Sequence, residues 1–232
     1  MSINRKLSVR CPKCGEISDI TVWSSITADD SPDLKKDLLS GRINMFRCPD
    51  CEAVALMPEP MLYSDSAKKL MISFYPTNDP VQKQERYEQI IKSSKGSGEL
   101  KALDGWNLRF LTDHNELLEK LLIFENGLND KAIEVIKLMI LSQDPDKSES
   151  RICRFGKHDG KVLEFMIHDF IENMIYTSSV PKDSYDQIYT SLIQSGMKPF
   201  SFDWEMVDAS YATRLLNGFN NNFFGDDKYD NG

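Results

Sequence analysis

Four of the five cysteines in this chain occur in two copies of one short motif. Residues 11–14 (CPKC) and 48–51 (CPDC) share the pattern Cys-Pro-x-Cys. Each pair places two sulfurs close enough to share one tetrahedral ion, and two pairs complete a shell of four thiolates. The motifs therefore predict a structural zinc site with the ligands Cys11, Cys14, Cys48 and Cys51. Because such a shell leaves no open position for substrate or water, it does not by itself indicate catalysis.

The segment between the two motifs is long but compatible with a shared metal. Closing a loop the length of residues 15–47 costs about 3 kcal/mol of chain entropy. Structural zinc contributes on the order of 10–16 kcal/mol in zinc-finger peptides, so metal binding outweighs this cost. Gly15 follows the first motif and can take the positive φ that such turns need, whereas Glu52 follows the second. We therefore expect the two turns to differ in geometry.

Redox chemistry is the main alternative for these cysteines. A Cys-Pro-x-Cys motif also occurs in glutaredoxin-like oxidoreductases, where a thiolate of lowered pKa caps a helix. Here Gly15 and a β-like segment follow the first motif, so no helix is available to lower that pKa. Duplication of the motif also favours a metal, while an iron–sulfur cluster and a disulfide remain open alternatives. The fifth cysteine, Cys153, lies alone in an expected strand, and we interpret it as a core residue.

Composition indicates an acidic protein that does not cross a membrane. The chain has 232 residues, 41% of them hydrophobic, and a formal net charge of −8. No apolar run approaches the roughly 18 residues needed to span a bilayer. The N-terminus (MSINRKLSVRCPKC) lacks the apolar stretch of a secretory signal. We therefore expect a cytoplasmic protein, in a compartment where thiols stay reduced.

The charge distribution disfavours nucleic acid as a partner. Residues 1–51 contain 8 Lys/Arg and 7 Asp/Glu, so the cysteine region is nearly neutral and the rest of the chain is acidic. Nucleic-acid-binding modules show a concentrated basic face, because phosphate contacts supply most of their affinity. A small basic face at Arg10, Lys13 and Arg47 is the feature that would support the opposite reading.

Hydrophobic patterning predicts an α+β protein. We expect a zinc-ribbon-like antiparallel β region with an inserted helix, then a helical hairpin, then a second small α+β block. The expected strands are 7–10, 17–26, 43–47, 54–57, 69–75, 107–111, 151–156, 161–168 and 174–180. The expected helices are 32–41, 77–93, 113–127, a helix capped at Asn129 or Asp130, 181–194 and 207–216. Residues 58–68, which include Leu62-Tyr63-Ser64-Asp65, are expected to form a turn region, and Gly96-Ser97-Gly98 a linker.

These elements suggest three parts along the chain. Residues 1–144 are expected to form the zinc-binding region, residues 148–224 a C-terminal α+β region, and residues 225–232 a disordered tail. The polar segment at residues 144–148 separates the first two parts.

The sequence predicts no catalytic and no cofactor-binding residues apart from the cysteines. His114, His158 and His168 form no recognisable ligand or triad spacing, so we expect each to be solvated or structural. The charged residues of the expected helical hairpin should form a solvated polar face, with a partner surface as the alternative (Glu119, Lys120, Glu134, Lys137). We therefore favour a protein that is not an enzyme.

The doubled motif and the segments after it resemble the family of CpXC proteins. The matching segments are VRCPKCG, DLKKDLLSGRINMFRCPDC, LYSD, KLMISFYP and NELLEKLLIFENGLNDKAIEVIK, over roughly residues 9–140. The resemblance implies a bacterial or archaeal protein that binds zinc through Cys11, Cys14, Cys48 and Cys51, and it implies no established activity. The chain departs from the family pattern at Glu52, where a glycine is common, and at Ser64, where a histidine is common.

Together these observations favour a non-catalytic protein stabilised by structural zinc, which presents a surface to another protein or to a second copy of itself. The first alternative is an enzyme of unknown reaction whose site lies between the two α+β regions. The second is a zinc protein that binds nucleic acid.

Overall fold

The computed structural model describes residues 1–97, 103–201 and 203–223, and its fold is α+β, as predicted. The chain forms two compact units, each described separately below. Unit 1 contains Met1–Leu121 and the short segment Phe200–Glu205, whereas unit 2 contains Leu122–Pro199 and the chain from Met206 onward. The domain division at residues 144–148 stays a prediction, because compact units need not be independent domains. Gly98 of the expected linker and the expected tail lie outside the described residues.

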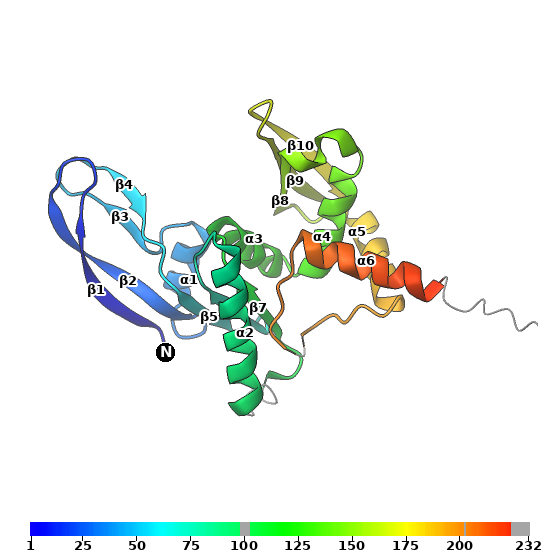
Figure 1. Cartoon of the computed structure of the whole chain (residues 1–232), viewed down its shortest axis with the longest axis horizontal. Coiled ribbons are helices and arrows are strands. Elements are labelled where there is room, and N and C mark those ends of the chain that lie inside the picture. The colour runs from blue at the N-terminus through cyan, green and yellow to red at the C-terminus, as the bar shows by residue number, and fades with distance from the viewer. Residues whose placement is uncertain (98–102, 202, 224–232) are drawn as a thin grey trace, which may run out of the picture. The chain divides into compact units, whose positions relative to one another are not determined.

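Unit 1 is built on a five-stranded sheet with the order β1-β2-β5-β6-β7 (Figure 1). Its strands are β1 (Ile3–Arg10), β2 (Ile17–Thr27), β5 (Met61–Asp65), β6 (Leu70–Phe74) and β7 (Asn107–Leu111). A separate two-stranded hairpin, β3 (Met45–Arg47) with β4 (Val54–Leu56), lies between β2 and β5 in the sequence. The helices of this part of the chain are α1 (Pro32–Leu39), α2 (Pro80–Ser97) and α3 (His114–Glu125).

The sheet of unit 1 is mixed, which corrects the expected purely antiparallel region. β1 pairs antiparallel with β2, and β5 pairs antiparallel with β6. In contrast, β2 pairs parallel with β5, and β6 pairs parallel with β7. Parallel neighbours require a long crossover connection. The chain provides one in α1 with the β3–β4 hairpin, and another in α2.

Strand β5 lies where the sequence analysis expected a turn, so that expectation was wrong. Residues Met61–Asp65 come directly after Pro58 and Pro60 and contain Ser and Asp, which are typical turn residues. Pairing on both sides explains the strand, because β5 lies between β2 and β6 and gains hydrogen bonds from each. Its alternate side chains Met61, Tyr63 and Asp65 are buried, and Asp65 pairs with Lys35 of α1 at 2.7 Å.

The segment Phe200–Glu205 extends unit 1 beside β7. Glu205 forms a parallel bridge with Arg109, and its backbone N–H donates to the carbonyl of Leu108 at 3.0 Å. The Arg109 side chain is fully buried, and its guanidinium lies 2.9 Å from the Glu205 carboxylate. This late segment of the chain therefore supplies a counter-charge to a buried arginine.

Unit 2 has a three-stranded antiparallel sheet of order β10-β9-β8, with helices packed on one face. Its elements are α4 (Asp130–Leu141), the 3₁₀ helix η2 (Pro145–Ser150), β8 (Arg151–His158), β9 (Val162–Asp169), β10 (Met174–Pro181), α5 (Lys182–Gln194) and α6 (Ala209–Phe223). The three strands and the 158–160 turn were expected. The Asn129 side chain caps α4 by accepting from the backbone N–H groups of Lys131 and Ala132. One cluster of buried apolar side chains, including Ile133, Phe155 and Phe165, forms the core.

The charged side chains that were expected to form a solvated face are mostly buried, which corrects that prediction. Glu119, Lys120 and Glu134 are 4%, 1% and 3% exposed. Glu134 forms an ion pair although it is buried, since the Lys137 ammonium lies 3.0 Å from its carboxylate. In the part of the chain that the structure describes, no helix has both the length and the apolar character needed to span a membrane.

Candidate metal centre

Two antiparallel hairpins deliver the cysteine motifs to one place. In the first, Arg10 of β1 pairs with Ile17 of β2, so residues 11–16 form the turn. In the second, Arg47 of β3 pairs with Val54 of β4, so residues 48–53 form the turn. The two turns have the same length and lie at corresponding positions of their hairpins. Figure 1 shows β3 and β4 beside the far end of the β1–β2 ribbon.

The two turns have the same backbone hydrogen bonds. The N–H of Cys11 donates to Glu16 O at 2.8 Å, and the N–H of Cys48 donates to Ala53 O at 2.8 Å. A second bond closes each turn, from Gly15 N–H to Cys11 O at 3.0 Å and from Glu52 N–H to Cys48 O at 3.1 Å.

The expected difference in turn geometry is therefore wrong. Glu52 has a φ of 57° and Gly15 a φ of 82°, so both residues lie in the left-handed region. A residue with a side chain pays a conformational cost there that glycine does not pay. The second turn accepts this cost in order to keep the geometry of the first.

The four sulfurs lie close enough together to hold one metal ion. The Sγ atoms of Cys11 and Cys51 are 3.6 Å apart, those of Cys14 and Cys48 are 3.5 Å apart, and all four lie within 4.8 Å of one another. With Zn–S bonds of about 2.3 Å, a tetrahedral zinc site places its sulfurs roughly 3.8 Å apart. The separations fit that shell and are far longer than the roughly 2.05 Å of a disulfide. All four cysteines are free thiols.

The thiols of the cluster do not share protons evenly, which favours a cation between them. Hydrogen bonding from the backbone N–H of Cys14 lowers the pKa of Cys11 to about 6. For Cys14 the Glu16 N–H acts in the same direction, but desolvation and the neighbouring cysteines outweigh it and raise its pKa to about 12. The first negative charge is therefore easily formed and further charges are resisted. A divalent cation at the centre would remove this conflict by neutralising the thiolates.

The cysteines share a small core of their own. Cys11, Phe46 and Cys48 are 2%, 0% and 1% exposed, and they pack with partly buried neighbours of the two hairpins, which are Val9, Ile20, Cys51, Ala53, Ala55 and Met57. Val9 and Phe46, each two residues before the first cysteine of a motif, are among the side chains that pack beneath the cluster. Cys14 is exposed, so the cluster lies at the surface and not deep inside unit 1.

Asn44 connects the second hairpin to β2, and the sequence analysis did not identify it. Its side chain accepts from the N–H of Trp23 at 2.7 Å and donates to Trp23 O at 3.0 Å. Its own carbonyl accepts from Met57 N–H at 2.8 Å, and its φ is 56°. The Asn44 side-chain amide thus makes the two hydrogen bonds with the Trp23 backbone that a neighbouring strand would otherwise make. Asparagine tolerates this backbone region better than most residues, which is the one signal the sequence offered.

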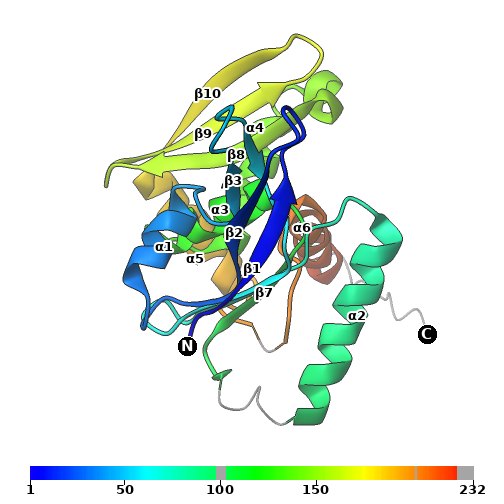
Figure 2. The ribbon, with the colours of Figure 1, turned by 90° about the vertical axis from the view of Figure 1, so that its left-hand side faces the viewer.

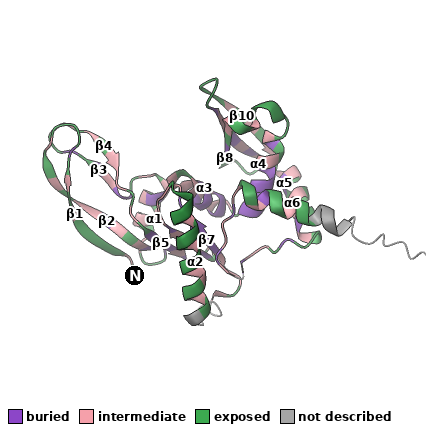
Figure 3. Cartoon of the chain, in the orientation of Figure 1, coloured by how far each residue is buried: buried purple, intermediate pink, exposed green. Residues whose placement is uncertain are grey.

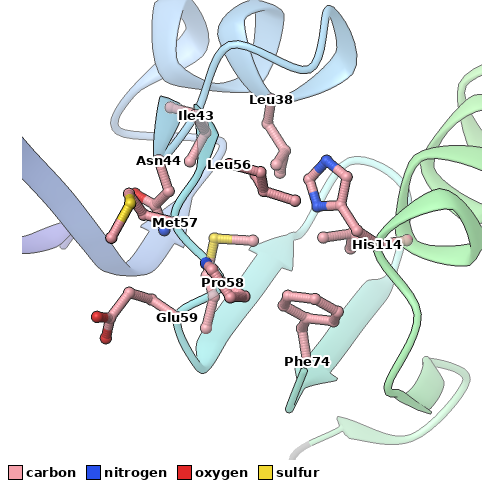
Figure 4. A pocket seen from close by; sticks show the side chains of 11 residues that line it. Leu38, Ile43, Asn44, Leu56, Met57, Pro58, Glu59, Phe74 and His114 are labelled. Carbon is pink, nitrogen blue, oxygen red and sulfur yellow. The ribbon is translucent and has the colours of Figure 1, made fainter. Parts of the chain in front are cut away.

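A small cavity lies at the base of the second hairpin but lacks the groups that catalysis requires. It measures about 10 Å³, close to the minimum for one water, and is lined mainly by apolar side chains of α1, β4, β5, β6 and α3. Figure 4 shows the Glu59 carboxylate pointing away from the His114 ring. Glu59 instead pairs with Arg5 at 2.9 Å. Burial lowers the pKa of His114, and this histidine does not pair with Glu59.

The other two histidines and the fifth cysteine lie in unit 2 and have structural roles. The Nδ1 atom of His158 is 3.1 Å from Val162 O within its hairpin, and the His168 ring lies 4.2 Å from that of Phe170. Cys153 is 3% exposed and belongs to the core of unit 2, as expected. Among the described residues, the four cysteines are the one group of Cys, His, Asp and Glu side chains placed to share a metal ion.

Comparison with known proteins gives one result. No curated protein and no solved structure matches the chain. The family model described as CpXC protein matches residues 9–137, which include both cysteine motifs, β5, β7 and α3. This match covers more than half of the 232 residues, and therefore the chain belongs to the CpXC family.

Proposed function

We propose that this protein is a non-catalytic interaction protein whose N-terminal ribbon is held in place by structural zinc. Cys11, Cys14, Cys48 and Cys51 would be the four ligands. The observation that carries the proposal is the convergence of four sulfurs at the ends of two hairpins. Among the described residues, no carboxylate or imidazole joins this group. A zinc ion bound by four thiolates has no free position for a substrate, and this supports a structural role.

The packing of the ribbon supports a stabilising role for the metal. None of the eight residues of β1 is buried, and only Val22 and Ile26 of β2 are. Figure 3 shows the β1–β2 ribbon mostly exposed or intermediate along its length. So little apolar burial does not hold two hairpins in register, because isolated hairpins are marginally stable in water. Zinc would supply the missing free energy.

The exposure of the same ribbon supports a role in macromolecular contact. No residue of β1 is fully buried, and the cysteine turns add exposed residues of both charges, such as Lys13 and Asp50. A nearly neutral surface of this kind is better suited to a protein than to nucleic acid, whose phosphates require a basic face. Four cysteines that must stay reduced to bind a metal also support a cytoplasmic location in this proposal.

Metal analysis combined with cobalt substitution tests this function. Native mass spectrometry of protein purified under reducing conditions should show one zinc ion per chain. After exchange for Co²⁺, the visible spectrum should be that of a tetrahedral four-thiolate site, and added azide, cyanide or phosphate should leave it unchanged. A spectrum that shifts with these small anions would reveal an open coordination position and would contradict a purely structural site. Protein that contains no metal would contradict the zinc centre itself.

A further inference from the structure

The two edges of the three-stranded sheet in unit 2 differ in how they are protected. A strand at the edge of a sheet presents unpaired backbone N–H and C=O groups, and monomeric proteins usually block such edges with charges, proline or bulges. The sheet has the order β10-β9-β8, so β8 and β10 are the two edges. Figure 2 shows β10 along the outer side of this sheet.

The β8 edge carries the usual protection. This strand has three basic residues, Arg151, Arg154 and Lys157, and its pairing with β9 is interrupted by a bulge between Phe155 and Lys157. Arg151 bonds Asp169 at 2.9 Å, and Lys157 lies 3.2 Å from the Glu164 carboxylate. Helix α4 also packs against this strand. A second strand could not pair here without displacing charged side chains.

The β10 edge has no charge and no bulge, although α5, which follows it directly in the chain, also packs against this strand. Its eight residues, MIYTSSVP, include no charge, and the single proline, Pro181, is the last of them. Pairing with β9 continues without a break from Met174 to Pro181. In the part of the chain that the structure describes, no strand pairs with the other side of β10. The edge is therefore long, regular and open, which predicts pairing with another strand.

The outer face of the same sheet is apolar next to this edge. Ile152, His168 and Ile175 form one row across the three strands, and Arg154, Met166 and Thr177 form the next. Ile152, Met166 and Ile175 are 41%, 51% and 69% exposed, and Phe170, stacked on His168, is 55% exposed. Because Ile175 lies on β10, a strand added at this edge would also cover part of the apolar face.

Charge indicates that the added strand is β10 of a second copy. The chain as a whole carries −8, which opposes self-association. The sheet is different, because residues 151–181 contain four basic side chains (Arg151, Arg154, Lys157, Lys161) and four acidic ones (Asp159, Glu164, Asp169, Glu172). Two copies can meet at this neutral sheet without net repulsion, and β10 places no charge opposite itself. At the centre of such a pair, Thr177 of one strand would face Thr177 of the other, a favourable cross-strand pairing.

We propose that two copies of this chain associate by antiparallel pairing of β10 with β10, joining their sheets into one continuous six-stranded sheet. The two-fold axis passes near Thr177, so Ile175 of each copy faces Ser179 of the other and both apolar faces lie on the same side. This inference rests on the interaction role proposed above and names its surface and partner. It assigns that contact to unit 2, whereas the cysteine cluster belongs to unit 1.

The test measures the mass of the full-length, zinc-loaded chain over a dilution series by sedimentation or light scattering. The wild type should reach twice the mass of the single chain, in a concentration-dependent way. Thr177→Lys places like charges opposite each other across the axis and should raise the dimer dissociation constant on the order of tenfold or more. Thr213→Lys makes the same substitution at an exposed site on α6 and should leave the constant unchanged. Met166→Ser, on the outer face but not at the edge, should leave the dimer intact.

Three results would overturn the inference. A wild type that is monomeric at every concentration would mean that β10 does not pair with a second copy, which would leave a strand of a different protein as the remaining partner. A dimer unaffected by Thr177→Lys would place the contact elsewhere, and a dimer lost with Met166→Ser alone would mean face-to-face packing. Circular dichroism checks that each variant folds. If Thr177→Lys does not fold, Ser179→Lys replaces it, because Ser179 lies on the same face of β10. Because the zinc content of each variant is measured as well, failure of this pairing is distinct from failure of the zinc centre.

Discussion

Two small β regions of this chain are stabilised by different means. The cysteine hairpins of unit 1 have a core of three buried residues, Cys11, Phe46 and Cys48, two of which are proposed metal ligands. The sheet of unit 2 packs one face on α4 and α5 through a cluster of fifteen buried residues. Under the proposed metal site, a strand pair with little apolar area to bury would instead be fixed by four thiolates around an ion.

The difference also extends to what each region can present to a partner. The ribbon of unit 1 buries few residues, with none in β1 and only Val22 and Ile26 in β2, so most of its surface stays accessible. The sheet of unit 2 must bury one face in its core, so only its outer face and its β10 edge are available. The predictions below are ordered from the largest expected effect to the smallest, and each tests how one or both of these regions are stabilised.

Removing one thiol from the cluster should have the largest effect. Cys11→Ser should lose most of a metal-binding free energy on the order of 10–16 kcal/mol, with loss of bound zinc and unfolding of the hairpins. Cys153→Ser alters a buried thiol of unit 2 and should cost only about 1–3 kcal/mol with zinc retained. Zinc stoichiometry and urea unfolding distinguish the two. Equal loss of zinc in both variants would break the comparison.

Truncating a core phenylalanine should lower the stability of unit 2 but the zinc affinity of unit 1. Phe165 is fully buried in unit 2, so Phe165→Ala should lower its free energy of unfolding by about 3–5 kcal/mol and leave the zinc content unchanged. Phe46→Ala should weaken zinc affinity, because folding of the hairpins is coupled to metal binding, yet full loading should return at saturating zinc. Competition with a zinc chelator measures the second effect. Unchanged zinc affinity in Phe46→Ala would contradict a shared core.

Loss of the Asn44 amide should loosen the second hairpin. Asn44→Ala leaves the N–H and C=O of Trp23 without these side-chain partners and should cost about 1–3 kcal/mol. Asn4→Ala, at an exposed position on β1, should change stability by less than about 0.5 kcal/mol. Thermal unfolding of the zinc-loaded proteins compares them. If both variants melt alike, Asn44 does not position the hairpin.

Substitutions of the residue that follows each motif should change the stability of the two turns in opposite directions. Glu52→Gly removes the cost of a positive φ and should stabilise the second turn by about 0.5–1 kcal/mol, after allowing for the greater flexibility of glycine when unfolded. Gly15→Ala should destabilise the first turn by a similar amount, because no heavy atom lies closer than 3.9 Å to its new Cβ and only the backbone is strained. Zinc affinities by competition provide the measurement. Two changes of the same sign would contradict matched turns.

The last effect should appear only in acid and only in unit 2. Hydrogen bonds from the backbone N–H of Glu172 and from Arg151 lower the pKa of Asp169. The stability that this carboxylate contributes is therefore complete above its unfolded pKa of about 3.9 and is lost as the pH falls through its lower folded value. Asp169→Asn lacks this titration, so its stability should change less with pH below about 4. A denaturation series that follows unit 2 checks this, and parallel pH curves for both proteins would refute it.

The sequence was most informative where the structure depends on local pattern. The doubled motif predicted the four converging sulfurs, and the alternating segment at residues 17–26 predicted β2. Pro32 and Gly41 correctly bounded α1, because proline fits the start of a helix and Gly41 takes a φ of 68° after its end. These features are set by a few neighbouring residues and survive in any tertiary context.

What the sequence could not show depends on partners distant along the chain. Residues Met61–Asp65 look like a turn until β2 and β6 pair with them, and Glu205 gives no sign of its contact with Arg109. The positive φ of Glu52 was hidden because the residue type argues against it, and only the repeated turn geometry explains it. Burial of Glu119 and Lys120 was missed for the same reason, since residue type alone indicates a solvated face.

The central claim is that a metal replaces a hydrophobic core in one region and not in the other. Hydrogen exchange of the full chain, followed peptide by peptide with and without a zinc chelator, tests it most directly. The account predicts that chelation abolishes protection in β1, β3 and β4 while β8, β9 and β10 keep theirs. Equal protection of the cysteine hairpins before and after complete metal removal would contradict it.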